Sequence, residues 1–361
     1  MLIFRKGGGA YDCINSGRLC ALLSNEKYHP EKAIRYNKTK NIKGEKTTMK
    51  SMKALTQESF NDEVLATVKA YYGAEYKVSI KEVIKNNDNQ LYGLFIRHPE
   101  ATCAPTIYLD HHYNEYLCGK AMSAILYDII MFHESNKTLG IDIKSSDITN
   151  FDNVKGKISF RLINLERNKE YLMDTPYIRF WDLAIVFFIA VATGEEGISS
   201  ITIHNSLMNI WGADVNTVYS IAKVNTEILF PASIRDMSQV LSDMIGGDNI
   251  EDIGNIFNQM DARKAEPIMY IATNSIGVNG ANVMLYDDLL RNFAFRKAAN
   301  LYLIPSSIHE IIILEAGGHM KPQDIRSMIA DINATEVSPE EVLSDNLYYY
   351  NRFTGSVTIA R

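Results

Sequence analysis

Cysteine is scarce in this 361-residue chain, and its four cysteines include no CxxC pair. So low a density excludes a disulfide-stapled scaffold and a cysteine-based zinc module. We interpret all four as reduced structural thiols, which are typical of a cytoplasmic protein. They are Cys13, Cys20, Cys103 and Cys118.

Long apolar runs are also missing. The longest extends from Leu183 to Ala192, about half of the ~20 residues that a membrane-spanning helix needs. Its valine, phenylalanine and isoleucine content is typical of a strand buried on both faces. The sequence therefore predicts a protein with no transmembrane segment and no membrane partner.

Positive charge is concentrated at one end of the chain. Residues 1–48 hold ten Lys or Arg against four acids, so the rest of a chain with net charge −6 carries −12. Binding a nucleic-acid backbone requires clustered Lys and Arg, and an acidic body does not supply them. We therefore expect no nucleic-acid partner.

Residues 1–48 show no helical or alternating period and no secretory signal. In low-GC codon usage, the codons for Lys43-Gly44-Glu45 resemble a ribosome-binding sequence a few codons before Met49. We expect translation to begin at Met49 or Met52, which makes 1–48 a mis-annotated or disordered extension.

The remainder predicts an α+β fold of mixed, largely antiparallel sheets with packed helices. A helix over 56–72, capped by Thr56, precedes the hairpin "EYKVSIKEVIK" and "LYGLFIRH", the strand "PTIYLDHHY" and a helix ending near Asn136. These elements form a small α+β unit over 52–140.

Two further units follow, although a single domain over 52–361 remains open. Residues 150–260 hold strands, a helix capped by Asp214 and two short helices around "GGDN". Residues 261–361 form a C-terminal α+β unit with a helix near 281–297 and a closing hairpin.

Several blocks resemble a known family. They include "PTIYLDHHYNEY", "ITIHNSLMNIWG", "LYLIPSSIHEIIIL" and "NATEVSPEEVLSDNLYYYNR". In this order they resemble an uncharacterised bacterial domain-of-unknown-function family of anaerobic Gram-positive gut bacteria, over about 55–361. The resemblance implies no established activity, substrate or cofactor.

One candidate metal set comes from the strand "PTIYLDHHY". Alternate residues of a strand share a face, so Asp110 and His112 would point together and His204, on another strand, would complete the set. Polar residues where a strand meets a loop are more often solvent-facing. We therefore predict no metal and no cofactor, and keep this set as an alternative.

Arginine and asparagine side chains around the middle segment are the ligand-binding candidates. Guanidinium and amide groups that converge in a cleft bind a carboxylate or phosphate in bidentate fashion. Arginines in extended runs also line sheet surfaces or pair with acids, so both interpretations stay open. The candidates are Arg161, Arg179, Asn205 and Asn274.

The motif "SSIHE" places Ser307, His309 and Glu310 between two apolar runs. If it stays extended, Glu310 points away from the imidazole; if it turns tightly, Ser307 and Glu310 form a capping box. Neither geometry builds a catalytic triad, and the chain has no Gly-x-Ser-x-Gly elbow. His309 alone remains a candidate acid or base.

The sequence thus favours a cytoplasmic binding or regulatory module for a partner protein or a small anionic ligand. The alternative is a hydrolase or metal-dependent enzyme that uses His309, or the Asp110, His112 and His204 set.

Overall fold

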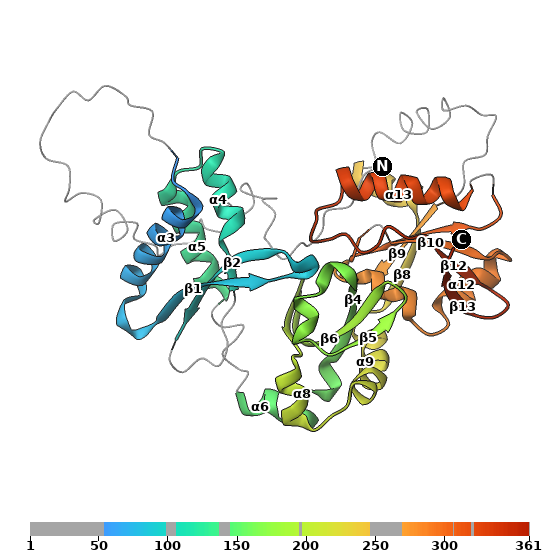
Figure 1. Cartoon of the computed structure of the whole chain (residues 1–361), viewed down its shortest axis with the longest axis horizontal. Helices are drawn as coiled ribbons and strands as arrows, with labels where there is room; N and C mark the ends of the chain where they lie inside the picture. Colours follow the sequence, from blue (N-terminus) through green and yellow to red (C-terminus); the bar gives the residue numbers. More distant parts are fainter. Residues whose placement is uncertain are drawn as a thin grey trace, which may run out of the picture.

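The chain has an α+β fold in which helices pack on three separate sheets (Figure 1). Every strand pairing in the described part of the chain is antiparallel. The sequence-based prediction of the fold class is therefore confirmed. The structure is a computed structural model that describes residues 54–98, 106–136, 145–194, 197–245, 269–305, 307–318 and 321–360.

Three sequence-based predictions lie outside these ranges. They are the N-terminal extension over 1–48, the second short helix after "GGDN", and the assignment of Cys13, Cys20 and Cys103 as reduced structural thiols. Among the described helices, none combines the length and the apolar content that crossing a bilayer requires.

The N-terminal unit, residues 54–136, has its own sheet and its own hydrophobic cluster around Phe60. The hydroxyl of Thr56 accepts a hydrogen bond from the backbone N–H of Ser59, so the predicted helix cap is confirmed. The elements are α3 (Gln57–Tyr72), β1 (Lys77–Ile84), β2 (Gln90–Arg97), β3 (Thr106–Tyr108), α4 (Leu109–Leu117) and α5 (Met122–Asn136).

The predicted strand "PTIYLDHHY" was wrong beyond Tyr108, because helix α4 begins at Leu109. Leu109 is fully buried, and the rings of Tyr113 and Tyr116 pack on Phe60 at centroid distances of 5.3 and 5.6 Å. Residues spaced by four and three positions share a helix face. Packing on α3 therefore makes this segment a helix where the sequence predicted a strand.

The main hydrophobic cluster of the described residues after the N-terminal unit runs from Val154 to Tyr350, and smaller clusters lie beside it. The carboxylate of Asp214 accepts the backbone N–H groups of Asn216 and Thr217, which confirms the predicted start of α9. The first elements are α6 (Ser145–Thr149), α7 (Phe151–Val154), β4 (Ile158–Asn164), β5 (Tyr177–Phe180), β6 (Leu183–Gly194), β7 (Gly197–Thr202), α8 (Asn205–Trp211) and α9 (Val215–Leu229).

The C-terminal part is a six-stranded sheet in the order β13-β12-β10-β11-β9-β8. Its closing hairpin is the predicted one, β12 with β13. The elements are β8 (Ala232–Asp236), α10 (Met237–Ile245), β9 (Met269–Asn274), η7 (Gly280–Leu285), α12 (Leu289–Lys297), β10 (Leu301–Ile304), β11 (Ile311–Glu315), α13 (Pro322–Thr335), β12 (Tyr348–Asn351) and β13 (Ser356–Ile359).

The helix predicted near 281–297 is broken into a 3₁₀ turn, η7, and the α-helix α12. Asp288 separates them with a φ of 58°, a left-handed conformation that no helix continues. Gly280 starts η7 where a Cβ atom would overlap the Thr273 hydroxyl and the His309 carbonyl. Close backbone packing therefore explains both the glycine and the short turn.

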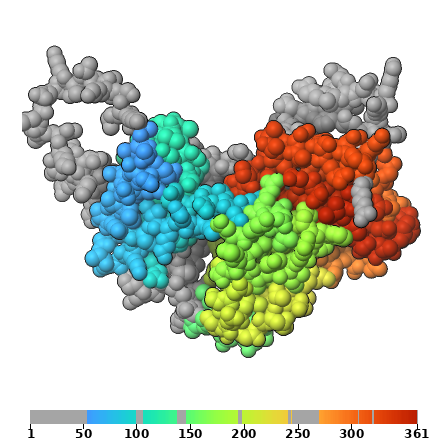
Figure 2. Space-filling view, viewed as in Figure 1, coloured from blue at the N-terminus to red at the C-terminus, as the bar shows by residue number. Residues whose placement is uncertain are grey.

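The tip of the β1–β2 hairpin joins the N-terminal unit to the central sheet (Figures 1 and 2). Asn87 donates its backbone N–H to Asn168 Oδ1 at 2.7 Å, and Asn168 Nδ2 donates to Asn87 Oδ1 at 2.9 Å. Asn168 is fully buried, so this reciprocal pair satisfies groups that are costly to leave unbonded. The same contact places the end of β1 against β4.

Candidate functional site

The candidate site lies where the end of β1 meets the central sheet. The carboxylate of Asp88 accepts the backbone N–H groups of Glu170 and Tyr171 at 3.0 and 2.9 Å. This contact and the Asn87–Asn168 pair anchor the hairpin tip two and three residues after Lys85. They fix Lys85 close to the charge of Arg161.

Lys85 directly follows strand β1 and is half-buried. Its ammonium group lies 4.4 Å from the centre of the Tyr108 ring, a cation–π contact. Within the described residues, no carboxylate lies within ion-pair distance of this ammonium and no acceptor hydrogen-bonds to it. A lysine so placed has lost hydration without gaining a partner of opposite charge.

Arg161 lies on β4 on the face opposite to Phe160 and Leu162, which enter the main core. Its Nη2 donates to the Tyr171 hydroxyl at 2.8 Å, and that hydroxyl lies 3.5 Å from Thr202 Oγ1. In the part of the chain that the structure describes, the guanidinium makes no other hydrogen bond and no ion pair. Four of its five N–H donors remain available to a ligand.

The pKa values of three side chains reflect this arrangement. Burial, and then the charge of Arg161, lower the pKa of the Lys85 ammonium to about 8. Burial raises the pKa of the Tyr108 phenol to about 12. Burial also acts to raise the pKa of Tyr171, but the charge of Arg161 and the hydrogen bonds that Tyr171 makes with Thr202 and Arg161 outweigh it, so that pKa lies below its usual value.

We call Lys85, Tyr108, Arg161, Tyr171 and Thr202 the cation site. All five residues are partly exposed. Two cations, two phenols and a hydroxyl converge, and all of them are able to donate hydrogen bonds. Such a donor set without an acid is suited to a carboxylate or a phosphate.

The sequence pointed to Arg161 but missed the other four residues of the cation site. They come from the residue after β1, from β3, from the 3₁₀ turn η5 (Tyr171–Met173) and from β7, and no spacing in the sequence connects them. The one available signal was a lysine that ends an alternating run directly before the turn "NNDNQ".

The other predicted ligand-binding residues do not join Arg161. Arg179 lies on the same face of the sheet, but it is exposed and its Nε donates to Trp181 O at 2.9 Å. Asn205 Nδ2 donates to Met173 O at 3.4 Å. Asn274 Oδ1 accepts two backbone N–H groups of the turn after β9, which is a structural role.

The alternative metal set is not assembled either. Asp110 and His112 lie on helix α4, where residues two apart point in different directions, so the argument from a shared strand face was wrong. Asp110 accepts the backbone N–H of Tyr92, and His204 pairs with Asp174 at 3.4 Å. The described residues contain no group of three metal-ligating side chains.

The described part of "SSIHE", residues 307–310, lies in the connection between β10 and β11 and bends the chain. The Ser307 hydroxyl donates to Glu310 Oε1 at 3.2 Å and accepts the backbone N–H of His309 at 3.0 Å. His309 is only 4% exposed, and its Nδ1 accepts the backbone N–H of Asn279 at 3.2 Å. Its Nε2 lies 3.6 Å from Glu341 Oε1.

This geometry gives the turn residues structural partners. A serine nucleophile must hydrogen-bond to the imidazole of its base, whereas Ser307 bonds the backbone of His309 and the Glu310 carboxylate. Because Nδ1 of His309 accepts a backbone N–H, the ring proton is assigned to Nε2, facing Glu341. The histidine thus connects three loops within the core.

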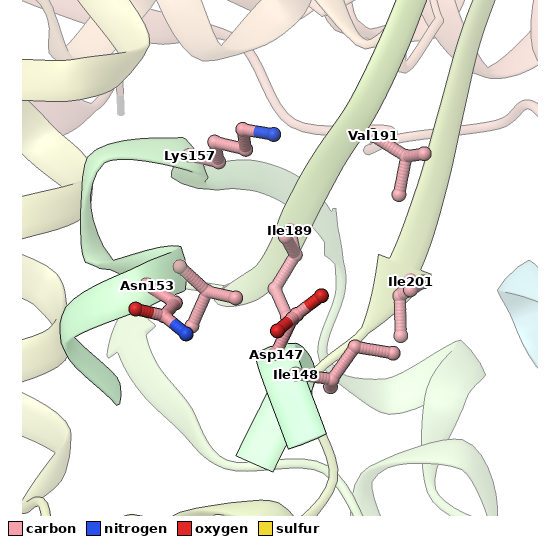
Figure 3. Close-up of a pocket in the computed structure, with 8 residues that line it drawn as sticks. Asp147, Ile148, Asn153, Lys157, Ile189, Val191 and Ile201 are labelled. Atoms are coloured by element: carbon pink, nitrogen blue, oxygen red, sulfur yellow. The ribbon is translucent and has the colours of Figure 1, made fainter. Parts of the chain in front are cut away.

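An open hollow of ≈ 300 Å³ lies on the other face of the central sheet (Figure 3). Three isoleucines and two valines form its walls, with Asp147, Asn153 and Lys157 at its edge. Ile189 in the hollow pairs with Ile158, whose side chain faces the main core, away from Arg161. The hollow is therefore separate from the cation site.

Fold and site together define an α+β protein with an electropositive group between its N-terminal unit and its central sheet. The chain belongs to a family of unknown function, DUF5688, whose family model matches residues 57–352. The match spans every residue of the cation site and confirms the sequence-based assignment to an uncharacterised family. No curated protein and no solved structure matches this chain.

Proposed function

We propose that this protein is a cytoplasmic bacterial protein that binds a small carboxylate or phosphate at the cation site. The observation that carries the proposal is the pair Lys85 and Arg161, two half-buried cations that interact with each other and with no acid among the described residues. Like charges held close together destabilise a fold unless an anion compensates them.

Recognition would combine two kinds of contact. The planar guanidinium of Arg161 presents a fork of N–H donors that matches two oxygens of a carboxylate or phosphate. The ammonium of Lys85 supplies a point charge, and the hydroxyl groups of Tyr171 and Thr202 lie beside Arg161. An anion at this position neutralises the repulsion and fills the free donors.

The position of the site favours a regulatory role for the bound anion. Lys85 and Tyr108 belong to the N-terminal unit, and Arg161 belongs to the central sheet. An anion that contacts both sides binds only when the hairpin is docked, so its binding stabilises the docked arrangement. Binding thereby couples ligand concentration to the position of the N-terminal unit.

Thermal unfolding with added anions tests this function. Sulfate, phosphate and succinate, compared with chloride at equal ionic strength, should stabilise the wild-type protein by about 2.7 kcal/mol at 100 times the Kd. Arg161→Met should abolish the response. Arg179→Met is the matched control, because Arg179 lies on the same sheet face and, among the described residues, hydrogen-bonds only to the backbone carbonyl of Trp181. An equal response of all three proteins would contradict a specific site.

A further inference from the structure

The amine of Lys85 has an unusual environment for a lysine beside an arginine. Its only described contact is with the Tyr108 ring, so no acceptor or carboxylate holds its proton. Asp88 lies nearby in sequence, but its carboxylate oxygens accept the backbone N–H groups of Glu170 and Tyr171. A nitrogen held by no acceptor is free to use its lone pair once it loses the proton.

We propose that Lys85 is a nucleophilic amine that condenses with the carbonyl group of a small 2-oxo carboxylate, whose carboxylate group is held by Arg161. This inference rests on the proposed anion-binding function and names its ligand class. The geometry supplies both halves of the recognition: a guanidinium with free N–H donors, and an amine without a partner in the same group of side chains.

The protonation state of Lys85 supports the inference. With its pKa lowered to about 8 by burial and by Arg161, roughly half of the Lys85 amines are unprotonated at pH 8. An ordinary lysine has a pKa near 10.4, so fewer than about one in a hundred is unprotonated at that pH. The charged and titratable groups that face this amine are Arg161, Tyr171 and Tyr108.

The condensation balances without an oxidant or a reductant. The amine nitrogen forms a bond to the carbonyl carbon as the π pair moves to oxygen, and proton transfer gives a carbinolamine. The hydroxyl group then leaves as water and a carbon–nitrogen double bond forms, while the carboxylate stays unchanged. The Tyr171 hydroxyl accepts a hydrogen bond from Arg161 and donates one to Thr202 Oγ1 at 3.5 Å, and this loosely held proton is the one that passes to the departing hydroxyl.

Reductive trapping tests the proposal on the full chain. The protein is incubated at pH 8 with glyoxylate and cyanoborohydride, which reduces the imine and leaves a carboxymethyl group on the modified lysine. Peptide mass spectrometry compares Lys85 with Lys81, an exposed lysine on β1, the strand that Lys85 directly follows. We expect Lys85 to be labelled at least about tenfold faster, because its free-amine fraction is larger.

Charge recognition is tested by comparing glyoxylate with acetaldehyde, an uncharged aldehyde. At Lys85 the ratio of glyoxylate to acetaldehyde labelling should fall about tenfold in Arg161→Met, because the lost guanidinium held the carboxylate. The ratio should not change in Arg179→Met. An unchanged ratio in Arg161→Met would overturn the proposal.

The outcomes also separate this inference from the proposed function. If Lys85 is labelled no faster than Lys81 while sulfate still stabilises the protein through Arg161, the amine chemistry is wrong and the anion site stands. If the stabilisation by sulfate is absent as well, both proposals fail.

Discussion

Replacing Lys85 by methionine removes one charge from the cation site and keeps a flexible side chain over the Tyr108 ring. We expect this variant to be more stable than the wild-type protein at pH 7 when no anion is added. The reason is that an ammonium group that lies beside Arg161, without an acid, costs free energy in the folded state.

The pKa of Lys85 sets the size of this effect. A shift from 10.5 to about 8 corresponds to at most about 3 kcal/mol, and solvent screening of a partly exposed group reduces it, so we expect about 1 to 3 kcal/mol. Below pH 8 the amine is charged in both the folded and the unfolded state, and the full cost is present. Between pH 8 and 10.5 the folded state releases its proton first, so the cost falls as the pH rises.

Urea unfolding at pH 7 and pH 9.5 measures the difference between Lys85→Met and wild type, because groups common to both proteins cancel. The gain in unfolding free energy should shrink by about half at the higher pH. Lys81→Met is the control; its side chain is exposed, and we expect a change within about 0.5 kcal/mol. A Lys85→Met variant that is less stable than wild type at pH 7 would refute the reasoning.

Two further substitutions test the core around His309. Gly280→Ala should lower the free energy of unfolding, measured with urea, by about 3 kcal/mol or more, because the new Cβ overlaps the Thr273 hydroxyl and the His309 carbonyl. Gly156→Ala is the matched control, because a Cβ at that position meets nothing within 4 Å. His309→Ala should lower the free energy of unfolding by about 2 to 4 kcal/mol in the same assay, since it leaves the backbone N–H of Asn279 without an acceptor and opens a cavity. The stabilisation by sulfate should stay unchanged in this variant. A stable His309→Ala protein would show that the histidine has no structural role.

Local signals were sufficient for much of the fold. Thr56 and Asp214 cap the helices that their side chains predicted, because a capping residue bonds to N–H groups only two or three positions away. The run from Leu183 to Ala192 is the buried strand β6, because its composition suits no half-exposed element. Ser307 and Glu310 bond to each other within their bend, one of the two conformations that the sequence left open, although not as a capping box.

Errors arose where distant packing overrode the local pattern. Residues 109–113 were predicted to continue a strand, but Tyr113 and Tyr116 meet Phe60 only if the segment is helical. The helix near 281–297 breaks at Asp288, where a left-handed residue turns the chain and Gly280 lets η7 approach the His309 carbonyl. Neither constraint is visible in the segments themselves.

The sequence by itself determined the elements, the fold class and the choice of Arg161 as a residue able to bind an anion, because periodicity, capping and guanidinium chemistry are local properties. Only the tertiary structure decided which partner Arg161 has. The reciprocal hydrogen bonds between Asn87 and Asn168, 81 positions apart, bring Lys85 close to Arg161. That convergence depends on the docking of one hairpin, and no short-range pattern encodes it.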